Sequence, residues 1–170
     1  MLNKIFKDYQ EYSKRSRSYL KPFFNPCFYI NVNFRISHFF YRLKLLLVAK
    51  IFWTINRVFF AVDIDPGAKL SGGFLILHGI GIVIGRHVET RGIVRIYQGV
   101  TLGGNNLKID EFEGKEIKQP VLMGNNIIGI NSVIIGPIVI GSNATIGSGS
   151  VITKSVKQGL TVVGNNKILY

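Results

Sequence analysis

The sequence predicts an all-β repeat fold, a parallel β-helix, preceded by a short amino-terminal α-helical extension. Aliphatic residues recur at every sixth position in two blocks, and neither block misses a position. A helix repeats about every 3.6 residues and a strand about every 2, so neither gives a bare period of six. A parallel β-helix does, because each short strand ends in a turn that returns the next strand to the central axis. The recurring positions are Ile64, Leu70, Ile76, Ile82, Val88, Val94 and Val100, then Leu122, Ile128, Ile134, Ile140, Ile146 and Ile152.

Small residues at fixed places in the second block support the same fold. The residue after the aliphatic anchor is often glycine, as at Gly129 and Gly147, and the fourth residue after it is often small, as at Ser132 and Ser150. Such residues fit a tight corner, where a bulky side chain would clash.

Residues 1–60 form a basic, amphipathic extension. Its start predicts a helix over residues 2–18 that ends near Lys21 and Pro22. Residues 33–60 predict one longer helix. The apolar face expected for that longer helix contains Ile36, Phe39, Phe40, Leu43, Leu47 and Ile51.

Residues 61–170 form the β-helix domain, with an inserted loop at 103–119. The step from Val100 to Leu122 is not a multiple of six, so the chain leaves the repeat here and re-enters it. The loop is polar and acidic, and long polar loops inside a compact repeat are usually functional.

The composition narrows the class of partner. The chain of 170 residues has 21 Lys and Arg against 9 acidic residues, a formal charge of +12. This excess favours an anionic partner such as a nucleotide-like cofactor, an acidic polysaccharide or an anionic membrane surface. No nucleic-acid-binding motif is present, so no nucleic acid partner is expected. The single cysteine, Cys27, fits a reducing compartment, so we expect a cytoplasmic protein.

Segment 36–62 is very apolar, but Arg42, Lys44, Lys50 and Arg57 interrupt it. A membrane-spanning helix needs roughly 20 nearly charge-free residues, so this segment is interpreted as amphipathic. No apolar run with a small-residue cleavage site follows the basic start, and we expect no signal peptide.

Among the three histidines, His78 is the candidate for chemistry. It follows a repeat anchor in the stretch Leu-Ile-Leu-His-Gly-Ile-Gly. A histidine with an accessible nitrogen acts as a general base near neutral pH, although a structural role fits this pattern equally well. His38 and His87 are interpreted as packing or surface residues.

Four segments carry a resemblance to a known family. Residues 63–70, 77–85, 100–104 and 120–152 resemble the bacterial serine acetyltransferases in order and spacing, and these enzymes are hexapeptide-repeat acyltransferases. The resemblance implies a left-handed parallel β-helix, assembled as a homotrimer, that uses acetyl-CoA as co-substrate at sites between neighbouring subunits. No metal is expected.

The resemblance also implies roles for individual residues. The family's catalytic histidine falls on His78 and its orienting aspartate on Asp63, with Asp65 as an alternative carboxylate nearby. The positions implied for cofactor binding are Gly103, Gly104, Ile130 and Ser148, with Lys167 near the CoA phosphates. Gly103 and Gly104 are also candidates to bind the oxyanion.

Two positions depart from the family. The family has an aspartate where this chain has Leu77, and a histidine that binds the amino acid where it has Gln119. Neutral residues at both positions predict an O-acetyltransferase of the sugar or polysaccharide branch, acting on a capsule or O-antigen glycan with His78 as base. The basic extension then predicts peripheral contact with the inner face of a membrane.

Two alternatives remain open at this point. One is serine O-acetylation in cysteine biosynthesis. The other, from a different class, is a non-catalytic β-helix scaffold that binds a partner through its basic extension.

Overall fold

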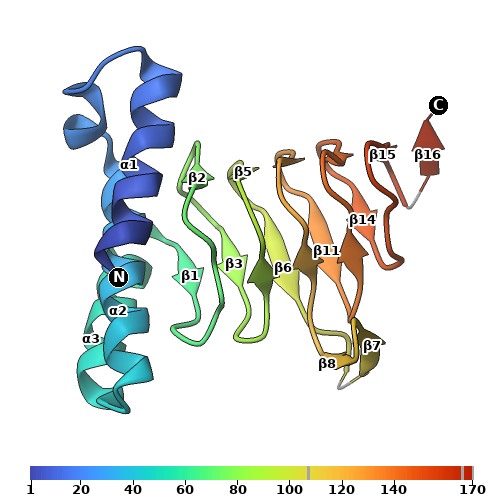
Figure 1. Ribbon diagram of the computed structural model, residues 1–170, viewed down its shortest axis with the longest axis horizontal. Coiled ribbons are helices and arrows are strands. Elements are labelled where there is room, and N and C mark those ends of the chain that lie inside the picture. Colours follow the sequence, from blue (N-terminus) through green and yellow to red (C-terminus); the bar gives the residue numbers. More distant parts are fainter. Residues whose placement is uncertain (107, 166, 170) are drawn as a thin grey trace.

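Strands of two or three residues wind into a three-sided prism, the left-handed parallel β-helix that the sequence predicts (Figure 1). The computed structural model describes residues 1–106, 108–165 and 167–169, and the side chains of 167–169 lie outside that description. The first face contains β1 (Asp63–Ile64), β3 (Val83–Ile84), β6 (Thr101–Gly103), β11 (Val133–Ile135) and β14 (Val151–Ile152). The second face contains β4 (Glu89–Thr90), β9 (Val121–Leu122) and β12 (Val139–Ile140). The third face contains β2 (Phe74–Ile76), β5 (Val94–Ile96), β10 (Asn126–Ile128), β13 (Thr145–Ile146) and β15 (Thr161–Val163).

Neighbouring strands within each face are parallel, and the chain visits the first, second and third faces in turn. At the carboxyl end, β16 (Lys167–Leu169) pairs antiparallel with β15 and covers the last open edge of the third face. An added antiparallel strand blocks the continued parallel stacking that an open edge invites.

The recurring aliphatic residues form the core of the prism. All thirteen are buried, with no more than 2% of the surface of any of them exposed. Burying side chains of this kind stabilises the fold by roughly 1.5–3 kcal/mol each relative to leaving them in water. The repeat in the sequence therefore corresponds to side chains that point into the core from the strands and from the residues next to them.

The coils of the first block differ in length. Ile64 pairs with Ile84 and Ile76 with Ile96, a step of twenty residues, whereas Ile84 pairs with Leu102 after eighteen. The corner after β2 therefore contains two extra residues. Side chains two positions apart on a strand face the same way. The six-residue spacing therefore passes from one inward-facing position of the coil to the other at this corner, and the residues in phase remain aliphatic.

Three α-helices and a short 3-10 helix precede the prism. They are α1 (Leu2–Ser16), η1 (Lys21–Phe24), α2 (Pro26–Arg42) and α3 (Leu46–Phe60). The helix predicted over residues 2–18 corresponds to α1, which ends at Arg17 in the left-handed conformation.

The single helix predicted over residues 33–60 is wrong. The chain reverses at residues 43–45, where Lys44 has a positive φ of 61°, and α2 and α3 pack side by side. The reversal turns the predicted apolar face away from the prism, so Phe39, Leu43, Leu47 and Ile51 are exposed. A different face of α2 carries the buried residues, among them Ile30 and Phe34.

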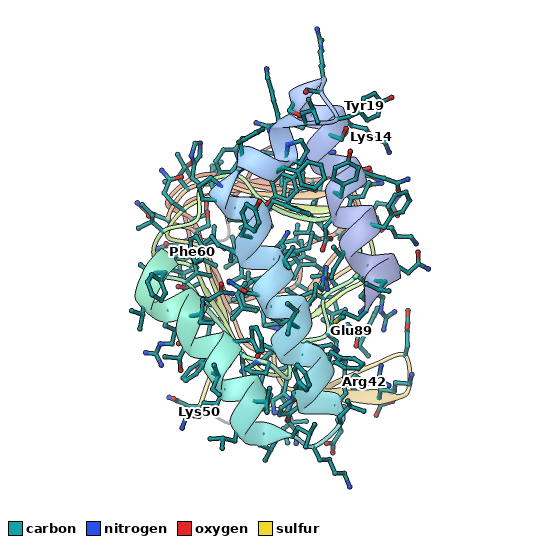
Figure 2. The ribbon with its side chains drawn as sticks, turned by 90° about the vertical axis from the view of Figure 1, so that its left-hand side faces the viewer. Lys14, Tyr19, Arg42, Lys50, Phe60 and Glu89 are labelled. Atoms are coloured by element: carbon teal, nitrogen blue, oxygen red, sulfur yellow. The ribbon has the colours of Figure 1, made fainter. Side chains whose placement is uncertain are left out.

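The helices cover the amino-terminal end of the prism (Figures 1 and 2). Strand β2 is the last strand of the third face there, so one of its edges has no neighbouring strand. Helix side chains bind that edge instead. Tyr12 Oη accepts from the N–H of Ile76 and donates to its carbonyl, and Asn31 donates to the carbonyl of Phe74.

A buried ion pair fixes α1 and α2 to the first coil. Arg35 Nε donates to Asp8 Oδ2 at 2.9 Å, and the two side chains are 2% and 1% exposed. Asp8 Oδ1 also accepts the backbone N–H groups of Gly73 and Phe74, and Arg35 Nη1 donates to the carbonyl of Leu70. Both charges are therefore fully hydrogen-bonded, which the burial of an ion pair requires.

Between β6 and β9 the chain leaves the prism in a hairpin of β7 (Asp110–Phe112) and β8 (Lys115–Ile117), the region of the predicted insertion (Figure 1). Arg91, on the prism, binds Glu89 at 2.8 Å and Glu113 of the hairpin turn at 2.5 Å, and lies over the ring of Phe112. The hairpin is thereby held against the second face.

The ion pair generates a prediction of stability. Replacing Arg35 by methionine leaves Asp8 buried without its cation, and we expect the free energy of unfolding to fall by about 3–5 kcal/mol. Urea denaturation followed by circular dichroism measures this. The control is Lys14→Met, which removes a 71% exposed partner of Glu11 and is expected to change little. An equal loss in both variants would contradict the assignment.

Candidate active site

His78 lies in the two-residue insertion that follows β2, at the edge of the prism between the third and first faces. We call this edge the His78 edge; it comprises residues 77–82, 97–100, 129–132 and 147–150. The imidazole is exposed, and its ring centre lies 6.1 Å from that of Tyr97 in the next coil. The extra length of this corner lifts the histidine out of the strand pattern, so its ring is accessible from solvent.

A hollow of about 560 Å³ lies beside His78, between the prism and the ends of α2 and α3. Its apolar lining includes Ile30, Phe60 and Ile80, and its polar lining includes Cys27 and Gln98. Burial raises the pKa of the Cys27 thiol, so the neutral, weakly nucleophilic form is favoured. The hollow therefore offers His78 as its reactive group.

Gln98 lines this hollow and has one polar atom without a partner. Its Oε1 is buried and accepts no hydrogen bond from any residue in the described parts of the chain. An unsatisfied buried acceptor of this kind is costly. Spacing along the chain did not indicate Gln98, because the coil from β2 to β5 is two residues longer than the six-residue repeat predicts.

Asp63 lies at the same edge. It begins β1 and pairs with Val83, the first strand residue after the His78 corner. Its Oδ1 accepts a hydrogen bond of 2.8 Å from Trp53 Nε1, and Arg57 Nε lies 3.7 Å from its Oδ2. The described contacts within one chain therefore join Asp63 to α3 and include no hydrogen bond to His78.

Asp65, the alternative carboxylate, lies at the other end of β1. Its Oδ1 accepts the N–H of Gly67 at 2.7 Å, and Arg86 Nε lies 3.3 Å from both carboxylate oxygens. This contact raises the pKa of Arg86. Asp65 thus caps a turn and pairs with a surface arginine, away from His78.

Leu77 does not line the hollow. It is half-buried and packs beside Tyr12, Phe28 and Leu75, under the helices. The side chain next to the histidine in sequence therefore belongs to the apolar contact between the prism and the helices, not to the face that His78 presents.

Gln119 lies at a different edge of the prism, between the first and second faces. We call this the Gln119 edge; it comprises residues 65–68, 85–88, 118–120 and 136–138. Gln119 Oε1 accepts the backbone N–H of His87 at 2.9 Å, and its amide lies where a Cβ on Gly85 would be. Gly104 lies close to the same amide, and Gly103 has open space beside it.

The residues implied for cofactor binding separate in the same way. Gly103 and Gly104 lie beside the Gln119 edge, whereas Ile130 and Ser148 lie on the His78 edge in successive coils. There the N–H of Ile130 donates to Ser148 Oγ at 3.2 Å. Lys167 begins β16, and its side chain lies outside the described residues. Within one chain, the residues predicted for the site therefore lie on two different edges of the prism.

His38 has a structural position. Its Nδ1 lies 2.8 Å from the carbonyl oxygen of Pro66, and burial lowers its pKa. The neutral ring links α2 to the first coil.

Residues 1–106, 108–165 and 167–169 contain no cluster of His, Cys, Asp or Glu suited to a metal ion. Over the same residues, no helix combines the length and apolar character needed to cross a bilayer.

Comparison with known proteins agrees with this geometry. Residues 120–154 match the family model for bacterial transferase hexapeptide repeats. The serine acetyltransferase of Helicobacter pylori is 33% identical over 132 residues, which cover 78% of this chain and 74% of that protein. The chain belongs to the serine acetyltransferase family.

Other serine acetyltransferases match over most of this chain. The Bacillus pumilus protein is 39% identical over 130 residues, 76% of this chain and 57% of its own length. A solved serine acetyltransferase in complex with CoA superimposes with a TM-score of 0.87 at 28% identity, covering 98% of this chain and 68% of that one. The chain thus spans little more than half the length of the curated relatives it matches first.

The predicted sugar or polysaccharide branch is wrong, because the matched relatives are serine acetyltransferases. The prediction assumed that Leu77 and Gln119 contact the acceptor. Within one chain, however, Leu77 packs under the helices and Gln119 accepts a hydrogen bond from the backbone of His87. The neutral side chain of Leu77 therefore does not report the charge of the acceptor.

The stacking of coils at the His78 edge generates a second prediction. A Cβ on Gly129 would lie 2.6 Å from the backbone nitrogen of Ser148, so Gly129→Ala forces two coils apart. We expect the free energy of unfolding to fall by about 1–3 kcal/mol, measured by urea denaturation. The matched control is Gly103→Ala, where a Cβ meets nothing within 4 Å. Equal stability of the two variants would contradict the packing.

Proposed function

We propose that the protein is a serine O-acetyltransferase that takes its acetyl group from acetyl-CoA. The observation that carries the proposal is the exposed His78 beside a hollow, in a member of this family. His78 supplies the base that takes the proton of the serine hydroxyl.

In the proposed reaction, a ring nitrogen of His78 takes the proton of the serine hydroxyl while its oxygen attacks the thioester carbonyl. The tetrahedral intermediate then collapses and the carbon–sulfur bond breaks. The imidazolium returns the proton to the leaving sulfur, which gives O-acetylserine and CoA. Asp63 orients the imidazole and stabilises its charged form in this reaction, for which its Oδ2 exchanges Arg57 Nε, 3.7 Å away, for His78 while Trp53 holds Oδ1.

We propose a homotrimer in which neighbouring chains complete each site. The two halves of the predicted site lie on different edges, and a cyclic assembly places the Gln119 edge of one chain against the His78 edge of the next. Exposed aliphatic side chains support this contact. Ile80 is 70% exposed on the His78 edge, and Val83 and Ile127 on the adjoining faces are 43% and 38% exposed. Acetyl-CoA then lies between the chains, against Ile130 and Ser148 of one and Gly103 and Gly104 of the other.

We also propose that the enzyme works in the reducing cytoplasm, at the inner face of the membrane. The free thiol of Cys27 suits that compartment, and the helices present a basic and apolar outer surface.

The reaction is tested with purified protein, acetyl-CoA and serine, by following the released CoA thiol and identifying O-acetylserine by mass spectrometry. His78→Ala is expected to lower kcat by about 10²–10⁴-fold and to keep its affinity for acetyl-CoA. Arg15→Ala, a change in an exposed residue of α1, is the control and retains activity. The proposal fails if the wild type forms no O-acetylserine, and the role of His78 fails if its variant keeps wild-type turnover.

The assembly is tested by mass photometry. We expect a mass near three times the 19.0 kDa of one chain. Val83→Glu places a charge in the proposed contact and is expected to give monomers, whereas Ile109→Glu, on the exposed excursion, leaves the trimer intact. A wild type that remains monomeric at working concentration would remove the shared site.

A further inference from the structure

The charged residues of the helices are mostly positive. The segment from Tyr12 to Val62 contains nine Lys and Arg and no acidic residue. Within it, only Arg35 is a buried cation paired with a carboxylate, that of Asp8. Lys14 and Arg57 pair with Glu11 and Asp63 at the surface, and the other cations give the outer surface of the helices a positive potential, which attracts an anionic partner.

The outer face of α3 is apolar and uncovered in the single chain. Figure 2 views this end of the molecule, with α3 in front of the prism. Ala49 and Asn56 are the buried residues of α3, and the opposite arc carries large aliphatic and aromatic side chains. These are Leu46, Leu47, Ile51, Val58 and Phe59, between 54% and 78% exposed. A shallow groove of about 330 Å³ runs along this arc.

Cations lie along one flank of the apolar row. At about 3.6 residues per turn, Lys50 and Arg57 are two turns apart on the same side of α3. Lys44, in the turn before α3, joins Lys50 and Arg42 around a second hollow of about 690 Å³, which Trp53 also lines. The described acidic residue in its lining, Asp65, already pairs with Arg86.

This combination favours a lipid surface over two other occupants. A second copy of the chain would bring the same acid-free, positive segment against itself. A nucleic acid would neutralise the cations but leave the apolar row in water. An anionic bilayer uses both features, because its phosphates meet the flanking cations and its acyl boundary covers the apolar arc.

We infer that α3 lies flat in the interface of an anionic membrane, with its apolar arc in the headgroup–acyl boundary and Lys44 and Lys50 at the lipid phosphates. The helices occupy one end of the prism, so the β-helix then extends away from the bilayer (Figure 1). This inference deepens the membrane location proposed above and does not depend on the reaction.

Vesicle co-sedimentation of the full chain tests the inference. Wild type is expected to bind vesicles of phosphatidylcholine mixed with phosphatidylglycerol at least tenfold more tightly than phosphatidylcholine alone, and to be weakened by added salt. Lys44→Gln with Lys50→Gln is expected to weaken binding by about 25-fold, roughly fivefold for each cation. Leu47→Glu with Ile51→Glu is expected to weaken it by at least about tenfold.

Matched changes on the excursion serve as controls. Lys108→Gln with Lys115→Gln, and Ile109→Glu, alter residues of the same kinds on another exposed surface and are expected to bind vesicles like the wild type. All variants are expected to acetylate serine at the wild-type rate without vesicles. The test of membrane binding is therefore independent of the test of the reaction.

Three outcomes would overturn the inference. The first is a wild type that ignores anionic vesicles. The second is an α3 variant that binds them as well as the wild type does. The third is a wild type that does not bind vesicles but shows another occupant of this face. That occupant is a second copy if the Leu47→Glu and Ile51→Glu variant forms an oligomer of lower mass, and a nucleic acid if the wild type binds a short DNA duplex.

Discussion

The open edge of the first coil is the constraint on which the rest of the molecule depends. A β-helix has unpaired backbone groups wherever its stacking stops, and buried backbone groups need partners. Here Asp8, Tyr12 and Asn31 supply them to the strand at the amino-terminal end. To deliver these side chains, α1 and α2 must lie across the end of the prism with fixed faces inward. The orientation of α3, which packs on α2, follows from theirs.

The fold could be predicted because the interior of the prism is repetitive. The coils place an aliphatic residue in the core at every sixth position of each block, so the period is written directly in the sequence. The reversal between α2 and α3 could not be predicted in the same way. Residues 42–46 read Arg-Leu-Lys-Leu-Leu, without a proline or glycine to mark a turn, and Lys44 adopts a positive φ that this residue type gives no reason to expect. Tertiary packing decides this turn.

The candidate site shows where resemblance helps and where it misleads. The sequence could identify His78 and Asp63 as residues of interest, and the structure brings both to one edge. It could not show that Gln119 and the glycines lie on another edge, because spacing along the chain does not report which corner a residue occupies. The acceptor was mispredicted for the same reason. A substitution informs specificity only if the side chain faces the substrate, and Leu77 faces Tyr12 and Phe28.

The two-residue lengthening at His78 has a consequence for how such a molecule varies. When two residues are added, the inward-facing side chains move by two positions along the sequence. In every later strand, the same set of side chains still faces outward. A single added residue would instead exchange the inner and outer side chains of the following strand. The corner that carries the histidine is therefore free to lengthen or shorten in twos without any change to the core. Reactive loops on this scaffold can diverge while the prism beneath them stays the same.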